Sequence, residues 1–265
     1  MAFEDDGFLS PDLVAWTATA RAQLKEWFDL VDSVNRKAMK ILFAIKPCQS
    51  RNQQLVPALL YRRALQSFQG AVIMAERGMI ADARSLVRSC AETAIAIGCL
   101  AIDDKFVDAL IEAHQSHRLH HANAILNDPE SRQELTGEQV NNLQQVVAEV
   151  TGQYQRPRPH GIIWEQAARN AKMTALYDTT YRMTSGDAAH TTVLALDRYV
   201  QPDDRGRIGR LTFEPETRDL ADTLSVATNS MLHAMVAIHQ VFPSKELGRT
   251  LNSCMEWWQN LEQRA

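Results

Sequence analysis

The chain of 265 residues is poor in cysteine and has no long uncharged apolar run. Its four cysteines form no CxxC pair, and Cys90 and Cys99 would lie too far apart along one helix to form a disulfide. We therefore expect four reduced and mostly buried thiols in a cytoplasmic protein. The longest uncharged apolar run, residues 93–102, is too short to cross a bilayer, and the acidic first residues, MAFEDDGF, lack an apolar signal segment. The sequence thus predicts no association with membranes.

Motifs of cofactor-dependent and metal-dependent enzymes are also missing. The sequence has no GxGxxG after a strand, no GxxxxGK[ST] and no GxSxG. Three histidines at spacings of three and four, His114, His117 and His121, share one helix face with His120 beside them, but no HExxH, CxxC or ExxH pattern accompanies them. We expect no cofactor and no metal, and we interpret the histidines as a polar stripe that faces solvent or a partner helix.

A strong positive charge is absent as well. The formal net charge of −4 argues against a protein that coats nucleic acid without specificity. The basic residues are nevertheless biased, with 21 arginines and 7 lysines. Arginine is suited to bidentate contacts with phosphate or carboxylate groups. A GC-rich genome produces the same bias, so composition leaves both explanations open.

Apolar residues recur in steps of three and four along most of the chain, which predicts an all-α helical bundle. Ser10 and Pro11 are a typical N-cap and first helical residue, and from there the pattern runs unbroken to residue 46, where Pro47 ends it. A helix of this length, roughly 50 Å, needs a long partner. We therefore expect the N-terminal helix, residues 1–46, to pack in a bundle or to act as an arm for oligomerisation or partner docking.

The remaining helices are expected over residues 53–77, 80–102, 103–127, 136–152, 164–173, 175–184, 187–199, 216–241 and 245–261. Gly78 should be the C′ residue of the first of these. Two polar loops, residues 154–161 and 201–215, interrupt the pattern, and the second has room for one short hairpin near residues 206–214. We expect one all-helical domain over residues 1–265 with long N-terminal and C-terminal helices, and with residues 51–242 as the core of the bundle.

A line of charge crosses the otherwise apolar helix at residues 80–102. Arg84, Arg88 and Glu92 follow one another at i+4 steps and share one face. In one interpretation an arginine is held ready for a phosphate and Glu92 orients it. In the other the charges form a structural ion pair that sets the register of the helix.

The stretch YDTTYRMTSGDAAH, residues 177–190, gathers a second set of polar side chains. Tyr177 and Tyr181 form one i+4 pair, and Asp178 and Arg182 form another in the orientation that favours an ion pair. We expect the Ser–Gly pair that follows to break the helix and to begin a new one, with Ser185 as its N-cap.

Asp187 and His190 would lie in the first turns of that new helix. There His190 would stand beside free N–H groups, a place that suits an anion or a reacting phosphate. With Arg182 nearby, it would be able to carry out acid–base chemistry on a phosphodiester without a metal. Alternatively Ser185 is only a cap, the tyrosines are core residues, and His190 is a buried and hydrogen-bonded histidine.

Three segments carry a resemblance to a known family: ADARSLVRSCAETAI, YRMTSGDAAH, and the LTFEP loop before the last long helix. Together they resemble the uncharacterised bacterial helical family called domain of unknown function five-six-seven-seven, over about residues 59–242. More distantly, the chain is similar to HEPN domains, helical bundles of bacterial conflict and toxin–antitoxin systems. Active HEPN domains are metal-independent ribonucleases that use an arginine and a histidine separated by four to six residues, one of them polar. The candidates here, Arg182 and His190, are separated by seven residues that include a glycine.

From the residues and the resemblance we predict a HEPN-like protein that acts on RNA or a nucleotide phosphate in a bacterial defence or stress setting. His190 and Arg182 would be catalytic, and the substrate would be bound by Arg84, Arg88, Glu92, Tyr181, Ser185 and Asp187. The alternatives are a non-enzymatic interaction module that dimerises or docks a protein partner, and a small-molecule sensor whose pocket is the same set of residues. A homodimer is the expected assembly.

Overall fold

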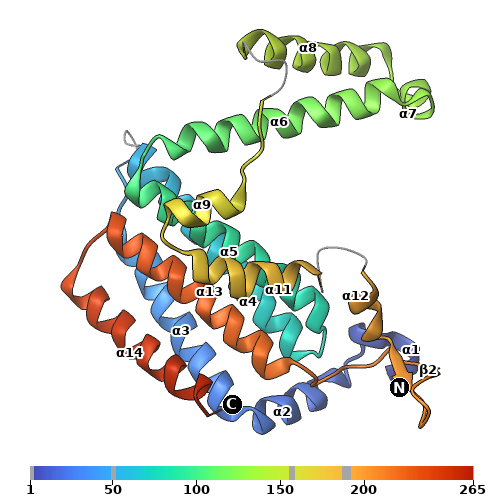
Figure 1. Ribbon diagram of the computed structural model, residues 1–265, viewed down its shortest axis with the longest axis vertical. Coiled ribbons are helices and arrows are strands. Elements are labelled where there is room, and N and C mark those ends of the chain that lie inside the picture. The colour runs from blue at the N-terminus through green and yellow to red at the C-terminus, as the bar shows by residue number, and fades with distance from the viewer. Residues whose placement is uncertain (1–2, 49–51, 155–158, 187–191, 265) are drawn as a thin grey trace. The chain divides into compact units, whose positions relative to one another are not determined.

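The fold is an all-α helical bundle with one small two-stranded sheet, as the periodicity of the sequence predicts. The computed structural model describes residues 3–48, 52–154, 159–186 and 192–264 (Figure 1). Contacts divide the chain into two compact units: residues 1–102 together with 164–265, and residues 103–163. Neither composition nor periodicity marks this division of the single domain expected from the sequence.

The core of the larger unit is built by four long helices that pack side by side: α3 (Lys25–Ala44), α4 (Asn52–Glu76), α5 (Ile80–Ile102) and α13 (Leu220–Val241) (Figure 1). A fifth helix, α14 (Lys245–Glu262), packs on α3 and α13. Helix α3 places Leu30, Val31, Val34 and Ala38 in the core, each at most 1% exposed. The second half of the expected N-terminal helix is therefore part of the bundle itself.

The expectation of one helix from residue 11 to residue 46 is wrong. The chain forms α1 (Phe3–Asp6), the short 3-10 helix η1 (Gly7–Leu9) and α2 (Leu13–Gln23) before α3. Leu24 separates α2 from α3 because its φ of −111° and ψ of 40° lie outside the helical region. Arg21 lies three residues before this bend, and its guanidinium contacts Asp32 at 2.6 Å and Glu76 of α4 at 2.8 Å. Periodicity cannot reveal this bend, because the apolar face continues through it.

Helix α5 matches its predicted bounds, and the end of α4 is confirmed as well. Gly78 has a φ of +77°, its N–H donates to Ala75 O, and the N–H of Met79 donates to Met74 O. These two hydrogen bonds form the Schellman motif for which a C′ glycine is suited.

By length and composition α5 is also long and apolar enough to span a membrane, but 61% of its most apolar window is buried within the protein. Such burial is that of a core helix.

Within the larger unit, a series of short helices precedes the hairpin and α13: α9 (Trp164–Asn170), α10 (Thr174–Leu176), the π-helix η2 (Tyr177–Tyr181), α11 (Arg182–Thr184) and α12 (Val193–Asp197). Strands β1 (Val200–Pro202) and β2 (Ile208–Leu211) then pair antiparallel, with Gln201 opposite Arg210. A short hairpin is present as expected, but it begins earlier than the expected residues 206–214: β2 lies within that range and β1 lies before it. Of the helix expected at residues 187–199, the described part is helical only over α12.

The smaller unit contains α6 (Phe106–Asn127), α7 (Pro129–Glu134) and α8 (Gly137–Gln153), with α6 and α8 packed together. Periodicity missed α7, which is short and begins with an Asp128 cap that accepts a hydrogen bond from the N–H of Ser131.

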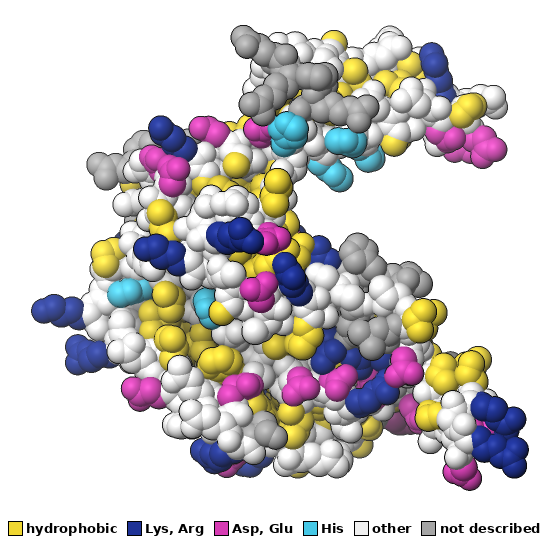
Figure 2. Space-filling model, in the orientation of Figure 1, with side chains coloured by type: hydrophobic (Ala, Val, Ile, Leu, Met, Phe, Trp, Pro, Cys, Tyr) yellow, Lys and Arg dark blue, Asp and Glu magenta, His cyan; other side chains and the backbone are white. Residues whose placement is uncertain are grey.

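The four histidines of α6 are all exposed, and Figure 2 shows histidine side chains along this helix. Within the described ranges, no three His, Cys, Asp or Glu side chains are grouped as ligands for a metal ion.

Candidate functional site

A π-helical turn, η2, shapes the polar stretch that the sequence singles out. The N–H of Arg182 donates to the carbonyl oxygen of Tyr177, five residues earlier, in place of the four-residue step of an α-helix. Because the turn is wider, residues four and five positions after Tyr177 both return to its side of the helix. Tyr181 and Arg182 therefore both contact Tyr177, which one turn of α-helix would not arrange. Single π-turns occur frequently at functional sites.

Four side chains are in contact in series around this turn, and we call them the Arg–Tyr stack: Arg88, Tyr181, Tyr177 and Arg182. The Arg88 guanidinium carbon lies 4.6 Å from the centre of the Tyr181 ring. The two tyrosine rings stack with centres 4.8 Å apart and planes inclined by 17°, which confirms the expected i+4 pair. The Arg182 guanidinium carbon lies 5.3 Å from the Tyr177 ring centre. The stack thus holds two cations against two aromatic rings.

Arg88 is the firmly held cation of the stack. Its Nε donates to Glu92 Oε1 at 3.2 Å and its Nη2 to the Tyr181 hydroxyl at 2.8 Å, which confirms the expected Arg88–Glu92 pair. The side chains of Arg88 and Glu92 are 21% and 28% exposed. Burial raises the pKa of Glu92 above its ordinary value, although the charge of Arg88 opposes that rise. Burial likewise raises the pKa of Tyr181, so its hydroxyl stays protonated at neutral pH.

Arg182 is the accessible cation of the stack. Its side chain is 56% exposed, and its Nε lies 3.3 Å from Asp178 Oδ1, which confirms the expected i+4 ion pair. A second carboxylate, that of Glu165 on α9, lies 3.7 Å from its Nη2. Ion pairs this exposed contribute little free energy, so an incoming anion displaces them at small cost.

Arg84 lies apart from the stack, although it shares the predicted charged face of α5. Its Nε donates to Thr223 Oγ1 at 3.1 Å, and its Nη2 lies 3.6 Å from Asp219 Oδ2. Its side chain is only 8% exposed. The start of α13 therefore holds Arg84 in an ion network of the core, one helical turn away from Arg88. The charged residues on this face of α5 therefore have two different sets of partners: Arg84 contacts the start of α13, and Arg88 contacts Glu92 and Tyr181. The periodicity of the sequence does not distinguish them.

The expectation that Ser185 is an N-cap is wrong. Its backbone is helical, with φ −67° and ψ −43°, and its hydroxyl donates to the carbonyl oxygen of Tyr181 at 2.5 Å. The helix continues through Ser185 because this back-bonding satisfies the hydroxyl within the turn. Asp187 and His190 lie outside the described residues.

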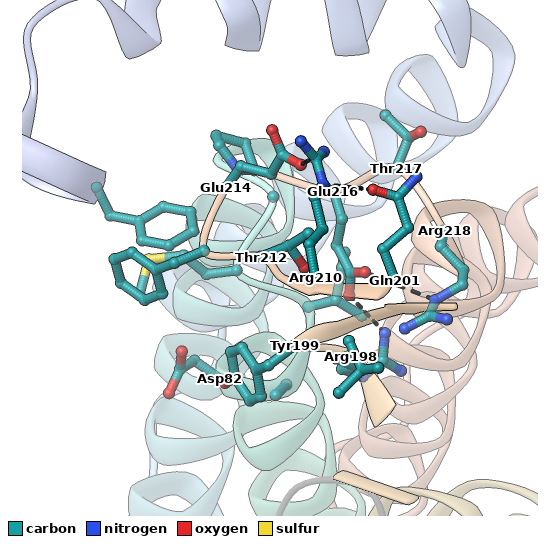
Figure 3. Close-up of a pocket in the computed structure, with 18 residues that line it drawn as sticks. Asp82, Arg198, Tyr199, Gln201, Arg210, Thr212, Glu214, Glu216, Thr217 and Arg218 are labelled. Carbon is teal, nitrogen blue, oxygen red and sulfur yellow. Dashed lines mark hydrogen bonds and ion pairs between the residues drawn. The ribbon is translucent and has the colours of Figure 1, made fainter. Parts of the chain in front are cut away.

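A cavity that the sequence did not indicate lies where the hairpin and its flanking loops meet the start of α5 (Figure 3). It measures about 490 Å³. Its most buried cation, Arg198, is 7% exposed and contacts Glu216 at 2.6 Å and Asp219 at 3.0 Å. Figure 3 shows Arg210 and Arg218 among the other lining side chains, and these contact Glu214 and Glu216 respectively. Arg210 and Glu214 lie in the polar loop expected at residues 201–215 and were the available signal, whereas the ion pairs of Arg198 depend on the tertiary structure.

The fold and this geometry define the class: an all-α bundle in which polar residues gather where the π-helical turn η2 packs against the core helix α5. The chain belongs to the family of unknown function DUF5677, which matches residues 54–207, more than half of the chain. The matched region includes every member of the Arg–Tyr stack, the smaller unit and the hairpin's first strand. No curated protein and no solved structure matches the chain.

Proposed function

We propose that the protein binds RNA or a nucleotide phosphate at the Arg–Tyr stack and cleaves a phosphodiester there without a metal, as a HEPN-like ribonuclease. The observation that supports this proposal is the joining of two guanidinium groups, Arg88 and Arg182, through a π-helical turn. Guanidinium groups suit the geometry of phosphate oxygens, and a π-turn is a rare local structure that occurs frequently at functional sites.

The two arginines have different roles in the proposed binding of phosphate. Arg182 is exposed and weakly paired, so it is the group that contacts the phosphate first. The phosphate then replaces the Asp178 carboxylate as its ion-pair partner. Arg88 is held by Glu92 and the Tyr181 hydroxyl, so it supplies a positive charge that does not have to be reorganised. The remaining tyrosine, Tyr177, stacks on Tyr181 and contacts the Arg182 guanidinium, so it links the accessible arginine to the rest of the stack.

We assign the proton transfer to His190 on the sequence alone. An imidazole with an ordinary pKa of about 6.5 accepts and returns a proton near neutral pH. In RNA cleavage it would take the proton of the attacking ribose 2′-hydroxyl. A 2′,3′-cyclic phosphate would form as the bond from phosphorus to the 5′ oxygen breaks, and the leaving oxygen would take up a proton.

The test uses labelled single-stranded RNA in the presence of a metal chelator, with binding read by fluorescence anisotropy and cleavage read on gels. We expect Arg182→Gln to weaken binding about tenfold, since one charge-assisted contact to phosphate is lost. Arg169→Gln is the matched control, because Arg169 is equally exposed and also pairs with Glu165 but lies outside the stack. We expect His190→Ala to bind RNA and not to cleave it. Cleavage by His190→Ala at the wild-type rate, or equal binding by the two arginine variants, would contradict the proposal.

A second candidate function, a non-enzymatic interaction module that dimerises in the cytoplasm, is favoured by the exposed apolar side chains near the hairpin. Val193, Ile208, Leu211 and Phe213 are between 65% and 85% exposed, and apolar exposure on this scale is typical of contact surfaces. Light scattering on the wild type and on Ile208→Lys tests it. A dimer that becomes a monomer in the variant supports the module, whereas a monomeric wild type removes it. A defence or stress setting follows only from the resemblance to HEPN domains.

A further inference from the structure

A second cavity lies at the ends of two core helices, far along the bundle from the start of α13. It measures about 450 Å³ and is formed by the last residues of α3, the end of α13 and the loop that leads into α14. Val241, which lines it, is 18 residues beyond Thr223, the partner of Arg84. At 1.5 Å per residue this is roughly 27 Å along α13. The cavity is therefore separate from the ion network at the start of that helix.

The floor of this cavity is apolar. Ile41 is buried, Ile45 and Phe242 are half-buried, and all three line the space. The volume is within the range of about 300–1,000 Å³ that small-molecule sites occupy. An apolar body of modest size would gain free energy by covering these side chains.

The charged side chains that are described around the cavity all carry the same sign. Lys37, Lys40 and Lys46 line it, and no carboxylate does so among the side chains that the structure describes. The clustering is selective, because the whole chain has only 7 lysines and its net charge is −4. Lys37 donates to Ser253 Oγ at 3.0 Å and to Cys254 Sγ at 3.2 Å, so one ammonium group is fixed in place.

The helix ends account for part of this arrangement. Lysines near helix C-termini complement the partial negative charge of the last carbonyl groups, and both α3 and α13 end here. That partial charge, about half an elementary charge per helix, is smaller than the three ammonium charges. The cavity therefore keeps an excess of positive charge above an apolar floor.

We propose that this cavity binds a small organic anion with an apolar body, through a carboxylate or phosphate head group placed among the lysines. The apolar body would lie on Ile41, Ile45 and Phe242. This ligand site is independent of the proposed RNA chemistry at the Arg–Tyr stack.

The experiment measures binding of decanoate and decyl phosphate to the full chain by calorimetry, below the concentrations at which they form micelles. We expect both to bind, and acetate and decyltrimethylammonium not to bind, since one lacks the apolar body and the other has the wrong charge. The double variant Lys40→Gln/Lys46→Gln should bind about tenfold more weakly, because two ammonium contacts are lost. Decanoate binding without decyl phosphate binding, or the reverse, identifies which head group the site accepts.

Two variants keep the test falsifiable. Lys25→Gln makes the same change of charge on α3 at a side chain that is 73% exposed and outside the cavity, so it should bind like the wild type. Ala44→Trp fills the cavity from an exposed lining position without removing charge, and should abolish binding. The proposal is overturned if the wild type binds neither decyl anion, if decyltrimethylammonium binds equally well, or if Ala44→Trp binds like the wild type.

Discussion

At the scale of single residues, the chemistry of the candidate site depends on how two arginines on one helix face are partnered. Arg84 contacts Asp219 and Thr223, whereas Arg88 donates hydrogen bonds to Glu92 and Tyr181. The Arg84 side chain is only 8% exposed, so removing its partner would leave a buried charge, and this pair helps to fix the packing of α5 on the start of α13. The side chains of Arg88 and Glu92 are 21% and 28% exposed, so the second pair remains partly open to solvent.

The pKa of Glu92 leads to a prediction about stability. Burial raises this pKa in the folded state, so the folded protein binds the proton more tightly than the unfolded chain does. The contribution of Glu92 to the free energy of unfolding therefore falls as pH rises above the ordinary glutamate pKa of about 4.3. In Glu92→Gln that part of the pH dependence should disappear.

Urea unfolding at a series of pH values between about 4 and 7 measures the effect of Glu92. The stability of Glu92→Gln relative to the wild type should rise with pH across this range. The same substitution at the exposed Glu26 serves as the control. A difference between Glu92→Gln and wild type that stays constant with pH would show that the folded protein does not perturb this carboxyl group.

At the scale of elements, the π-turn η2 is the feature that brings the stack together. Deleting the exposed residue Thr179 should convert the turn to an ordinary α-helix, because a π-turn holds one residue more than an α-helical turn. We expect the total helix content to stay near that of the wild type. The near-ultraviolet circular dichroism of the stacked tyrosines should weaken, and RNA binding should fall as in Arg182→Gln.

Thr179→Ala is the control for the deletion, since it removes the side chain and keeps the length of the turn. It should resemble the wild type in its near-ultraviolet spectrum and in its RNA binding. A deletion variant that keeps its near-ultraviolet spectrum and its RNA binding would show that the extra residue has no part in placing the stack.

The glycine between α4 and α5 supports another prediction at this scale. Gly78 has a φ of +77°, and a Cβ added there would lie 2.6 Å from the backbone nitrogen of Glu216. Gly206 has a similar φ of +72° but open space around it. Gly206→Ala should cost about 1 kcal/mol of unfolding free energy from backbone strain alone. Gly78→Ala should cost about 2 kcal/mol more, because the loop that follows β2 must also move.

Chemical denaturation of the two alanine variants separates strain from crowding. Equal losses of stability would mean that the approach of the Glu216 backbone to Gly78 does not constrain the protein.

At the scale of the whole molecule, the two compact units differ in how much core they contain. Among the described residues of 103–163 few side chains are buried, namely Ser116, Leu119, Ala122, Val150 and Pro159, whereas the larger unit contains the long buried faces of α3, α4, α5 and α13. We expect the larger unit to fold without the smaller one, because stability follows the apolar area that a unit buries.

Replacing residues 103–163 by a flexible Gly/Ser linker of about 12 residues tests this expectation. The shortened chain should unfold in one cooperative transition by circular dichroism, with a urea slope reduced in proportion to the surface that is lost. Loss of the cooperative transition would mean that the larger unit requires the smaller one to complete its core.

The sequence by itself determined the all-α class, the bounds of α5, the Schellman end of α4, the second strand of the hairpin and the i+4 pairs of the stack. These features depend on residues within a few positions of one another, and periodicity and capping report such short-range physics directly. Only the tertiary structure decided the bend at Leu24, the separation of Arg84 from Arg88, and the two cavities. Each of these depends on groups far apart in the chain, such as Arg84 and Thr223, 139 residues apart, or Lys37 and Ser253, 216 residues apart. Which of several possible partners a charged side chain meets is fixed by packing, and local pattern carries no record of it.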